Sequence, residues 1–93
     1  MTVTVDLPTV LAGLAGTSRL VLEVPHPASV ADVLDVVGEV HPAVERRVRD
    51  ETGAMRRYVN VYVDGGDVRA LQGAATPVPD GAVVLVVPSI AGG

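Results

Sequence analysis

The 93-residue sequence contains no cysteine, lysine, tryptophan or phenylalanine, so its seven basic residues are all arginine. Without cysteine there can be no disulfide, thiolate zinc site, iron–sulfur cluster or cysteine nucleophile. Without lysine there can be no lysine-bearing phosphate loop, no Schiff-base catalysis and no lysine-linked chain of this protein on itself. These absences exclude most side-chain enzymatic chemistry.

Metal, membrane and nucleic-acid functions are also disfavoured. His26 and His41 lie far apart, each beside a proline, so no metal site is predicted. No targeting segment is evident, and the longest apolar run, 82–88, is too short to span a bilayer, so we expect a cytoplasmic location. The net charge of −4 argues against nucleic acid.

The charge is nevertheless uneven. Residues 46–57 hold five arginines against Asp50 and Glu51, a local charge of +3, which leaves −7 for the rest. With almost no aromatic residues nearby to stack on bases, this segment is either a solvated surface or one that faces a protein partner.

What is present is enough for one small folded domain. Hydrophobic residues make up 48% of the chain, which allows a single core and argues against disorder. Strict alternation over 1–7 predicts a half-buried strand, and the β-branched run 19–24 predicts a second strand antiparallel to it. The glycines and hydroxyl residues of 9–18 predict a loop or short turn between them.

One amphipathic helix is expected over about 29–41. Ser29 and Asp32 have the spacing of a capping box, with aspartate in place of the usual glutamate or glutamine. Apolar residues then recur at helical spacing from Val30 to Val40, with acidic residues on the other face. After Pro42 we expect a short arginine-rich helical turn that ends near Gly53.

The second half of the chain is predicted to be mainly strand. Residues 57–64 alternate, 64–67 form a glycine turn, 68–71 form an edge strand or 3₁₀ turn, 73–79 form a loop, and 82–88 form a last, central strand. The helix must cover one sheet face, and its crossover leads into a mixed sheet. The fold class is therefore α+β: a ubiquitin-like β-grasp of four to five strands with one main helix on one face.

The chemistry is expected at the end of the chain. We divide it into a β-grasp domain, 1–88, and a flexible tail, 89–93, which ends in Gly92-Gly93. Two residues without side chains let an extended tail enter a narrow channel and approach a bound nucleotide. A partner enzyme could then let the terminal carboxylate attack the α-phosphate of ATP, giving an acyl-adenylate open to a sulfur or nitrogen nucleophile.

The sequence resembles the MoaD/ThiS family of sulfur carriers over nearly its whole length, and most closely the actinobacterial branch that serves cysteine synthesis. The residues that carry the resemblance are Val3-Thr4-Val5, Leu7-Pro8-Thr9, Val59 to Asp64, Leu71-x-Gly73, Thr76, Val78, Asp80-Gly81, Val83 or Val84, Pro88, Ile90 and Gly92-Gly93. Together with the terminal position of Gly-Gly, they form a fairly specific pattern.

The resemblance implies a protein substrate rather than an enzyme, with no bound cofactor. An E1-like adenylyltransferase would use ATP to activate the carboxylate of Gly93, and a sulfur donor would convert it to a thiocarboxylate. The sulfur would pass to an aminoacrylate on a pyridoxal-phosphate-dependent cysteine synthase, and a metallopeptidase would trim the cysteine from the tail. In other branches the sulfur goes to molybdopterin or to the thiazole of thiamin.

The resemblance also implies a docking surface. By analogy with the family, Leu85 and Val87 face outward with Leu71, next to Pro88, whereas Val84 and Val86 point to the helix. Ile90 and Ala91 would make extended contacts in the partner's channel, ahead of Gly92 and Gly93. Two alternatives stay open beside a sulfur carrier: a ubiquitin-like modifier joined to lysines of other proteins, and a β-grasp interaction domain whose tail is incidental.

Overall fold

The computed structural model describes residues 1–88. In this part of the chain, the principal sheet and helices are β1 (Thr2–Asp6), α1 (Thr9–Ala15), β2 (Arg19–Glu23), α2 (Val30–Val40), α3 (Pro42–Val48), β4 (Val59–Val63), β5 (Gly66–Asp67) and β7 (Val83–Pro88). Two short strands, β3 (Ala28–Ser29) and β6 (Pro77–Val78), pair separately, and 3₁₀ turns η1 and η2 cover Val68–Ala70 and Gly73–Ala75.

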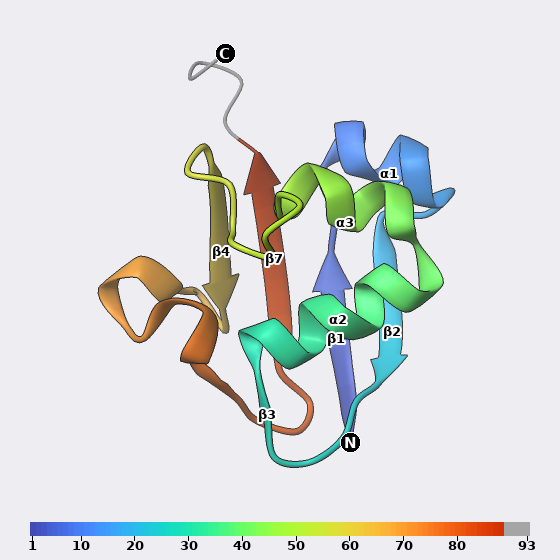
Figure 1. Cartoon of the computed structure of the whole chain (residues 1–93). Helices are drawn as coiled ribbons and strands as arrows, with labels where there is room; N and C mark the ends of the chain where they lie inside the picture. The colour runs from blue at the N-terminus through green and yellow to red at the C-terminus, as the bar shows by residue number, and fades with distance from the viewer. Residues whose placement is uncertain (89–93) are drawn as a thin grey trace.

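The main sheet has the predicted mixed topology. Its strand order is β2-β1-β7-β4-β5. β1 runs antiparallel to β2 and parallel to β7, which in turn runs antiparallel to β4. The last strand therefore lies between the first strand and β4, in the middle of the sheet (Figure 1). The predicted β-grasp is confirmed.

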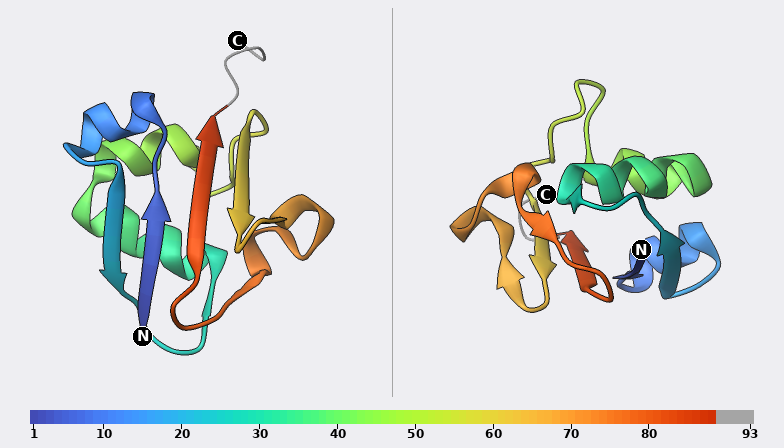
Figure 2. Two further views of the ribbon diagram at one scale, coloured as in Figure 1. Left: turned by 180° about the vertical axis from the view of Figure 1, so that it is seen from behind. Right: turned by 90° about the horizontal axis from the view of Figure 1, so that it is seen from below.

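The core lies between this sheet and the helices that cover one of its faces. Alternate residues of the central strands, such as Val5, Val61 and Val84, are at most 1% exposed. They meet the apolar stripe of α2, where Val33 and Leu34 are equally buried. Period-two strands and a period-3.6 helix thus supply complementary apolar faces. No helix of residues 1–88 covers the opposite sheet face, as the view from behind shows (Figure 2).

Helix α2 forms where the sequence predicts it, and for the predicted reason. The Ser29 hydroxyl accepts a hydrogen bond from the Asp32 amide at 3.3 Å. The Asp32 carboxylate in turn accepts one from the Ser29 amide at 2.8 Å. This capping box satisfies amide groups that the first turn of a helix leaves without partners.

Two sequence-based predictions about neighbouring segments need correction. The loop or turn expected over 9–18 is wrong for its first part, because 9–15 form helix α1, which buries Leu11 and ends at Gly16 with φ +79°. Past Pro42, the helix ends earlier than predicted. α3 stops at Val48, and Arg49 then forms an isolated antiparallel bridge with Met55.

The glycine turn predicted over 64–67 is confirmed for its first half, whereas Gly66–Asp67 pair with β4 as β5. The loop predicted over 73–79 is wrong in part, because it contains η2 and β6. Asp64 and Gly65 both adopt positive φ, which reverses the chain after β4. The Asp64 carboxylate accepts a hydrogen bond from the Val83 amide at 2.8 Å, so this turn is fastened to β7. Residues 68–70 take the 3₁₀ form rather than the edge strand. Among the helices of residues 1–88, none has the length and hydropathy needed to cross a membrane.

Candidate functional site

The predicted reactive end of the chain follows the central strand. Pro88 is the last residue of β7, and it pairs with Val59 at the beginning of β4. The predicted tail residues Ile90, Ala91, Gly92 and Gly93 lie outside the residues that the structure describes. What the fold defines is the position from which they continue, at the end of a strand whose first half pairs with β1 and β4 and whose last residues pair with β4.

β7 presents different side chains to its two faces. Val84 and Val86 are buried against the helices, whereas Leu85 is 38% exposed on the face that carries no helix. Val87 shares the parity of Leu85 and is half-buried, as is Pro88. An apolar strand with one face open to solvent is typical of an interaction surface.

A shallow hollow surrounds Leu85 on this outer face. It is lined by Asp6, Tyr62, Asp64, Gly65, Val83 and Leu85. Tyr62 on β4 and Asp6 on β1 flank Leu85 from the two neighbouring strands, since both pair with it. Neither Asp6 nor Tyr62 was predicted to belong to the site, although the alternation of 57–64 places Tyr62 on the opposite strand face from Val61.

The apolar part of the outer face extends beyond β7. Val83 is 40% exposed and pairs with Thr4, which pairs on its other side with Val21 of β2, 67% exposed. The sequence predicts only that Val21 belongs to a strand. Val21 lies beside Thr4 and Val83 across the sheet because of the register of β1 with β2 and β7, which the sequence alone does not specify.

Leu71 lies in a different place from the other predicted docking residues. It follows η1 and is 56% exposed. Its Cδ1 atom packs so closely on Gly66 of β5 that a Cβ at position 66 would lie 3.3 Å away. Leu85 and Val87 thus share one strand face, while Leu71 lies at the β5 edge of the sheet, outside the hollow around Leu85.

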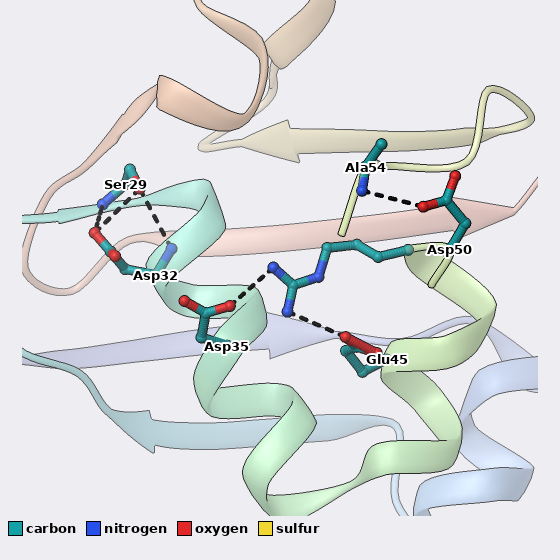
Figure 3. A network of polar contacts seen from close by, with 7 residues as sticks. Ser29, Asp32, Asp35, Glu45, Asp50 and Ala54 are labelled. Carbon is teal, nitrogen blue, oxygen red and sulfur yellow. Dashed lines mark hydrogen bonds and ion pairs between the residues drawn. The ribbon is translucent and has the colours of Figure 1, made fainter. Parts of the chain in front are cut away.

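A second polar site is built around Arg49, between α2 and α3. Its guanidinium forms ion pairs with Asp35 at 2.9 Å and with Glu45 at 3.2 Å. Figure 3 shows these two carboxylates approaching from separate helices. The Arg49 side chain is only 11% exposed, and its Nε atom is buried without a partner. Arg49 therefore joins two helices, unlike Arg46, Arg47 and Arg57 of the same segment, which are exposed.

The loop after Arg49 holds one perturbed carboxyl. The Asp50 carboxylate accepts hydrogen bonds from the Thr52 hydroxyl at 2.5 Å and from the Thr52 amide at 2.8 Å. Weaker contributions come from the Ala54 amide (Figure 3) and from the charge of Arg56. Because these donors favour the ionised form, they lower the pKa of Asp50 below its ordinary value.

No metal site was predicted. Within residues 1–88, no group of three or more histidine, aspartate or glutamate side chains is arranged to hold a metal ion. His26 lies exposed in the turn before β3, and His41 lies between α2 and α3.

Comparison with known proteins connects this geometry to a family. The profile of the ThiS family matches residues 5–93. The sulfur carrier protein CysO of Mycobacterium tuberculosis is 33% identical, over all of this chain and all of its own. Small archaeal modifier protein 1 of Haloferax volcanii is 35% identical over 89% of this chain and 91% of its own.

Solved structures agree in shape over the whole domain. The crystal structure of small archaeal modifier protein 1 from Haloferax volcanii superposes with a TM-score of 0.86 at 27% identity, covering 100% of both chains. A chain of the BexX/CysO complex of Amycolatopsis orientalis superposes with a TM-score of 0.82 at 34% identity, covering 98% of this chain and 99% of that one. Relatives in both sequence and structure therefore include proteins named as carriers and proteins named as modifiers.

Proposed function

Because this chain belongs to the ThiS family of sulfur carriers, we propose that the carboxylate of Gly93 carries sulfur as a thiocarboxylate for cysteine biosynthesis. The chain is a protein substrate and not a catalyst. The observation that carries the proposal is the family match that runs through residue 93, joined to the full-length likeness to a protein named as a sulfur carrier.

The chemistry needs two displacements at the Gly93 carboxyl. A carboxylate oxygen attacks the α-phosphate of ATP on an E1-like enzyme, and pyrophosphate leaves. Sulfur from a donor then attacks the acyl carbon of the adenylate, and AMP leaves with the oxygen. Gly92 and Gly93 have no side chains to obstruct either attack. Ile90 and Ala91 contact the channel through which the tail, 89–93, reaches the nucleotide.

The partner enzymes bind the β-grasp domain, which presents the tail to them. Leu85 and Val87 on the outer strand face, with Pro88 at the end of β7 and Leu71 at the sheet edge, form the proposed docking residues. The partners are an E1-like adenylyltransferase, a pyridoxal-phosphate-dependent cysteine synthase and a metallopeptidase. The synthase holds the aminoacrylate that the thiocarboxylate sulfur attacks, and the peptidase releases the cysteine formed.

Intact-mass measurement tests the carrier step. The protein is incubated with ATP, an E1-like adenylyltransferase and sulfide. We expect a gain equal to the exchange of one oxygen for one sulfur, and no gain in a variant that lacks Gly93. Adding a cysteine synthase with bound aminoacrylate should then add the mass of aminoacrylate, so that the total gain over the starting protein equals one cysteine residue. A mass that never changes, with partner binding that survives truncation, would indicate an interaction domain whose tail is incidental.

The molecule that accepts the sulfur, or the Gly93 carboxyl, distinguishes the remaining candidate functions. A thiocarboxylated protein that ignores aminoacrylate but sulfurates a molybdopterin or thiazole precursor would place the chain in another carrier branch. The 35% identity to small archaeal modifier protein 1 favours protein modification as the second candidate. That function predicts adducts in cell extract in which Gly93 is joined to lysines of other proteins, and these should disappear on deletion of Gly93.

A further inference from the structure

The two edges of the main sheet are protected to different degrees. At one edge β5 has only two residues, and the Arg69 guanidinium donates to the carbonyls of Arg57 and Val59, where β4 begins, at 2.6 and 2.8 Å. At the other edge β2 is a regular strand of five residues, and within residues 1–88 no strand lies on its far side (Figure 2). It contains neither proline nor lysine, with which proteins commonly block an exposed edge. The β2 edge is therefore open to a further strand.

The backbone groups of Val21 and Glu23 point toward this open edge. Where β1 and β2 meet, the Val24 amide donates to the Met1 carbonyl at 2.8 Å, and the Met1 amino group donates to the Val24 carbonyl at 2.9 Å. Hydrogen-bonded pairs of an antiparallel ladder recur at every second residue. The even-numbered residues of β2 therefore bond β1, and Val21 and Glu23 direct their amides and carbonyls away from it.

The beginning of this edge is already covered. The Thr17 hydroxyl lies 3.3 Å from the Arg19 amide nitrogen and 3.2 Å from the Arg19 carbonyl oxygen, and it bonds both. Within residues 1–88, no side chain does the same for Val21 or Glu23. The backbone that a further strand can reach is therefore centred on Val21.

The side chains of β2 place an exposed apolar residue between two opposite charges. Val21 is 67% exposed, the highest value among the large hydrophobic side chains of residues 1–88. Arg19 pairs with Asp6 at 2.9 Å, but its side chain stays 66% exposed. Glu23 accepts from the Thr2 hydroxyl at 2.7 Å and is also exposed. Both charged side chains therefore have surface left for a further contact.

The order Arg19, Val21, Glu23 is complementary to itself when two copies of β2 run antiparallel. A two-fold axis at Val21 brings the same surface of both copies together. Arg19 of each copy then lies opposite Glu23 of the other, with the side chains on one sheet face. The two Val21 residues form a hydrogen-bonded pair, because their backbone groups face the edge. A parallel pairing in register would instead place like charges opposite each other.

We propose that the open edge of β2 pairs antiparallel with β2 of a second copy of this chain, which gives a symmetric dimer. The inference is independent of the proposed function, because β1 separates β2 from β7, at whose end Pro88 lies. An edge-to-edge contact buries little surface, so we expect a weak dimer with a dissociation constant on the order of 0.1–1 mM.

NMR relaxation of the whole ¹⁵N-labelled chain measures the association. About 0.15 M salt screens the charge of −4 that each copy carries. We expect the rotational correlation time to rise toward twice the monomer value between about 10 µM and about 2 mM protein. Exchange of the Val21 amide with solvent should slow over the same range, because the amide becomes hydrogen-bonded. A chain that is monomeric at about 2 mM, with an unprotected Val21 amide, overturns the proposal.

A lysine at the centre of the edge tests the position of the contact. Val21→Lys places like charges opposite each other at the two-fold axis and should weaken association about fivefold to tenfold. Val83→Lys is the matched control, because Val83 is 40% exposed on the same sheet face but belongs to β7. The control should stay within about twofold of the unchanged protein. Association that persists in Val21→Lys, or that is lost equally in both variants, overturns pairing through β2.

A charge exchange tests the antiparallel register. Arg19→Glu and Glu23→Arg each place like charges opposite each other at both ends of the pair, so each variant alone should associate at least about fivefold more weakly. Mixed in equal amounts, the two variants restore both opposite-charge pairs, and a labelled sample of one should associate with the other. Circular dichroism verifies that each variant is folded. A mixture of folded variants that does not associate overturns the register.

The remaining outcome concerns a different occupant of the edge. The same labelled chain is observed with and without an E1-like adenylyltransferase. A Val21 amide that is protected only when this enzyme is added would show that a strand of the enzyme covers the edge, and it would overturn the second copy as the occupant.

Discussion

Arg49 illustrates how burial separates residues that look alike in sequence. It is one of five arginines within 46–57, and the sequence gives no reason to treat it differently from Arg47. The structure pairs it with Asp35 on another helix and leaves its side chain almost enclosed. Its partner could not be predicted, because the pairing depends on how α2 and α3 pack.

We expect Arg49→Met to destabilise the fold by about 1–3 kcal/mol, since it leaves the half-buried carboxylate of Glu45 without its partner. Urea unfolding measures the change. Arg47→Gln, which changes an exposed side chain of α3, is the control and should stay within about 0.5 kcal/mol. Arg49→Lys should be less stable than the unchanged protein, because a single ammonium group replaces a guanidinium that pairs with two carboxylates. Equal stability of Arg49→Met and the unchanged protein would show that the network contributes nothing.

Asp50 supplies a prediction about pH. Thr52→Val removes the hydroxyl that does most to lower the pKa of Asp50, so that pKa should rise toward its ordinary value. Because the folded pKa lies below the unfolded one, ionised Asp50 stabilises the fold above roughly pH 4, and this contribution disappears as the pH falls through the folded pKa. NMR titration of the Asp50 carboxyl carbon measures the shift. An unchanged pKa in Thr52→Val would assign the effect to the backbone amides instead.

At the scale of elements, α2 and α1 show which kinds of helix can be predicted from a sequence. α2 has a capping box and four buried apolar residues at helical spacing, so both its type and its position are predictable. α1 has seven residues, includes Gly13 and buries only Leu11. Its signals were Pro8 before the helix and Gly16 after it, but the glycine content of 9–18 outweighed them in the prediction. Packing against α3 and the sheet, rather than propensity, stabilises so short a helix.

The capping box of α2 gives the prediction at this scale. Ser29→Ala removes the hydroxyl that accepts from the Asp32 amide, and it should lower the free energy of unfolding by about 1 kcal/mol. Chemical denaturation monitored by circular dichroism checks this value. Ser18→Ala is the matched control, since Ser18 is exposed and its recorded bond uses its backbone carbonyl. A loss of equal size in both variants would contradict the cap as the cause.

At the scale of the whole molecule, the mixed sheet and the central place of β7 were predictable from the sequence. Which side chains gather on each surface was predictable only in part. Alternation along β7 correctly separates buried Val84 and Val86 from exposed Leu85. It cannot show that Tyr62 flanks Leu85 or that Leu71 lies at the edge, because these depend on register and on the path of η1. The contacts of Arg69 with the carbonyls of Arg57 and Val59 are unpredictable for the same reason.

The outer face carries the last prediction. Leu85→Gln should leave the free energy of unfolding within about 1 kcal/mol, because the side chain is already partly solvated. It should weaken activation by an E1-like enzyme about tenfold, since the proposed docking surface loses its central apolar side chain. Val21→Gln is the control two strands away and should change activation less than about twofold. The half-saturating carrier concentration measures both, and equal effects would place the docking residues elsewhere.

The central position of β7 also determines how the domain responds to a pulling force. A force applied to the chain beyond Pro88 pulls along the axis of a strand that is hydrogen-bonded to β1 on one side and to β4 on the other. Those hydrogen bonds lie across the direction of pull, so they are loaded together in shear and cannot be opened one after another. A pull along β7 from Pro88 therefore has to break several hydrogen bonds at once, whereas a force that peeled β7 away from β4 would meet them one at a time.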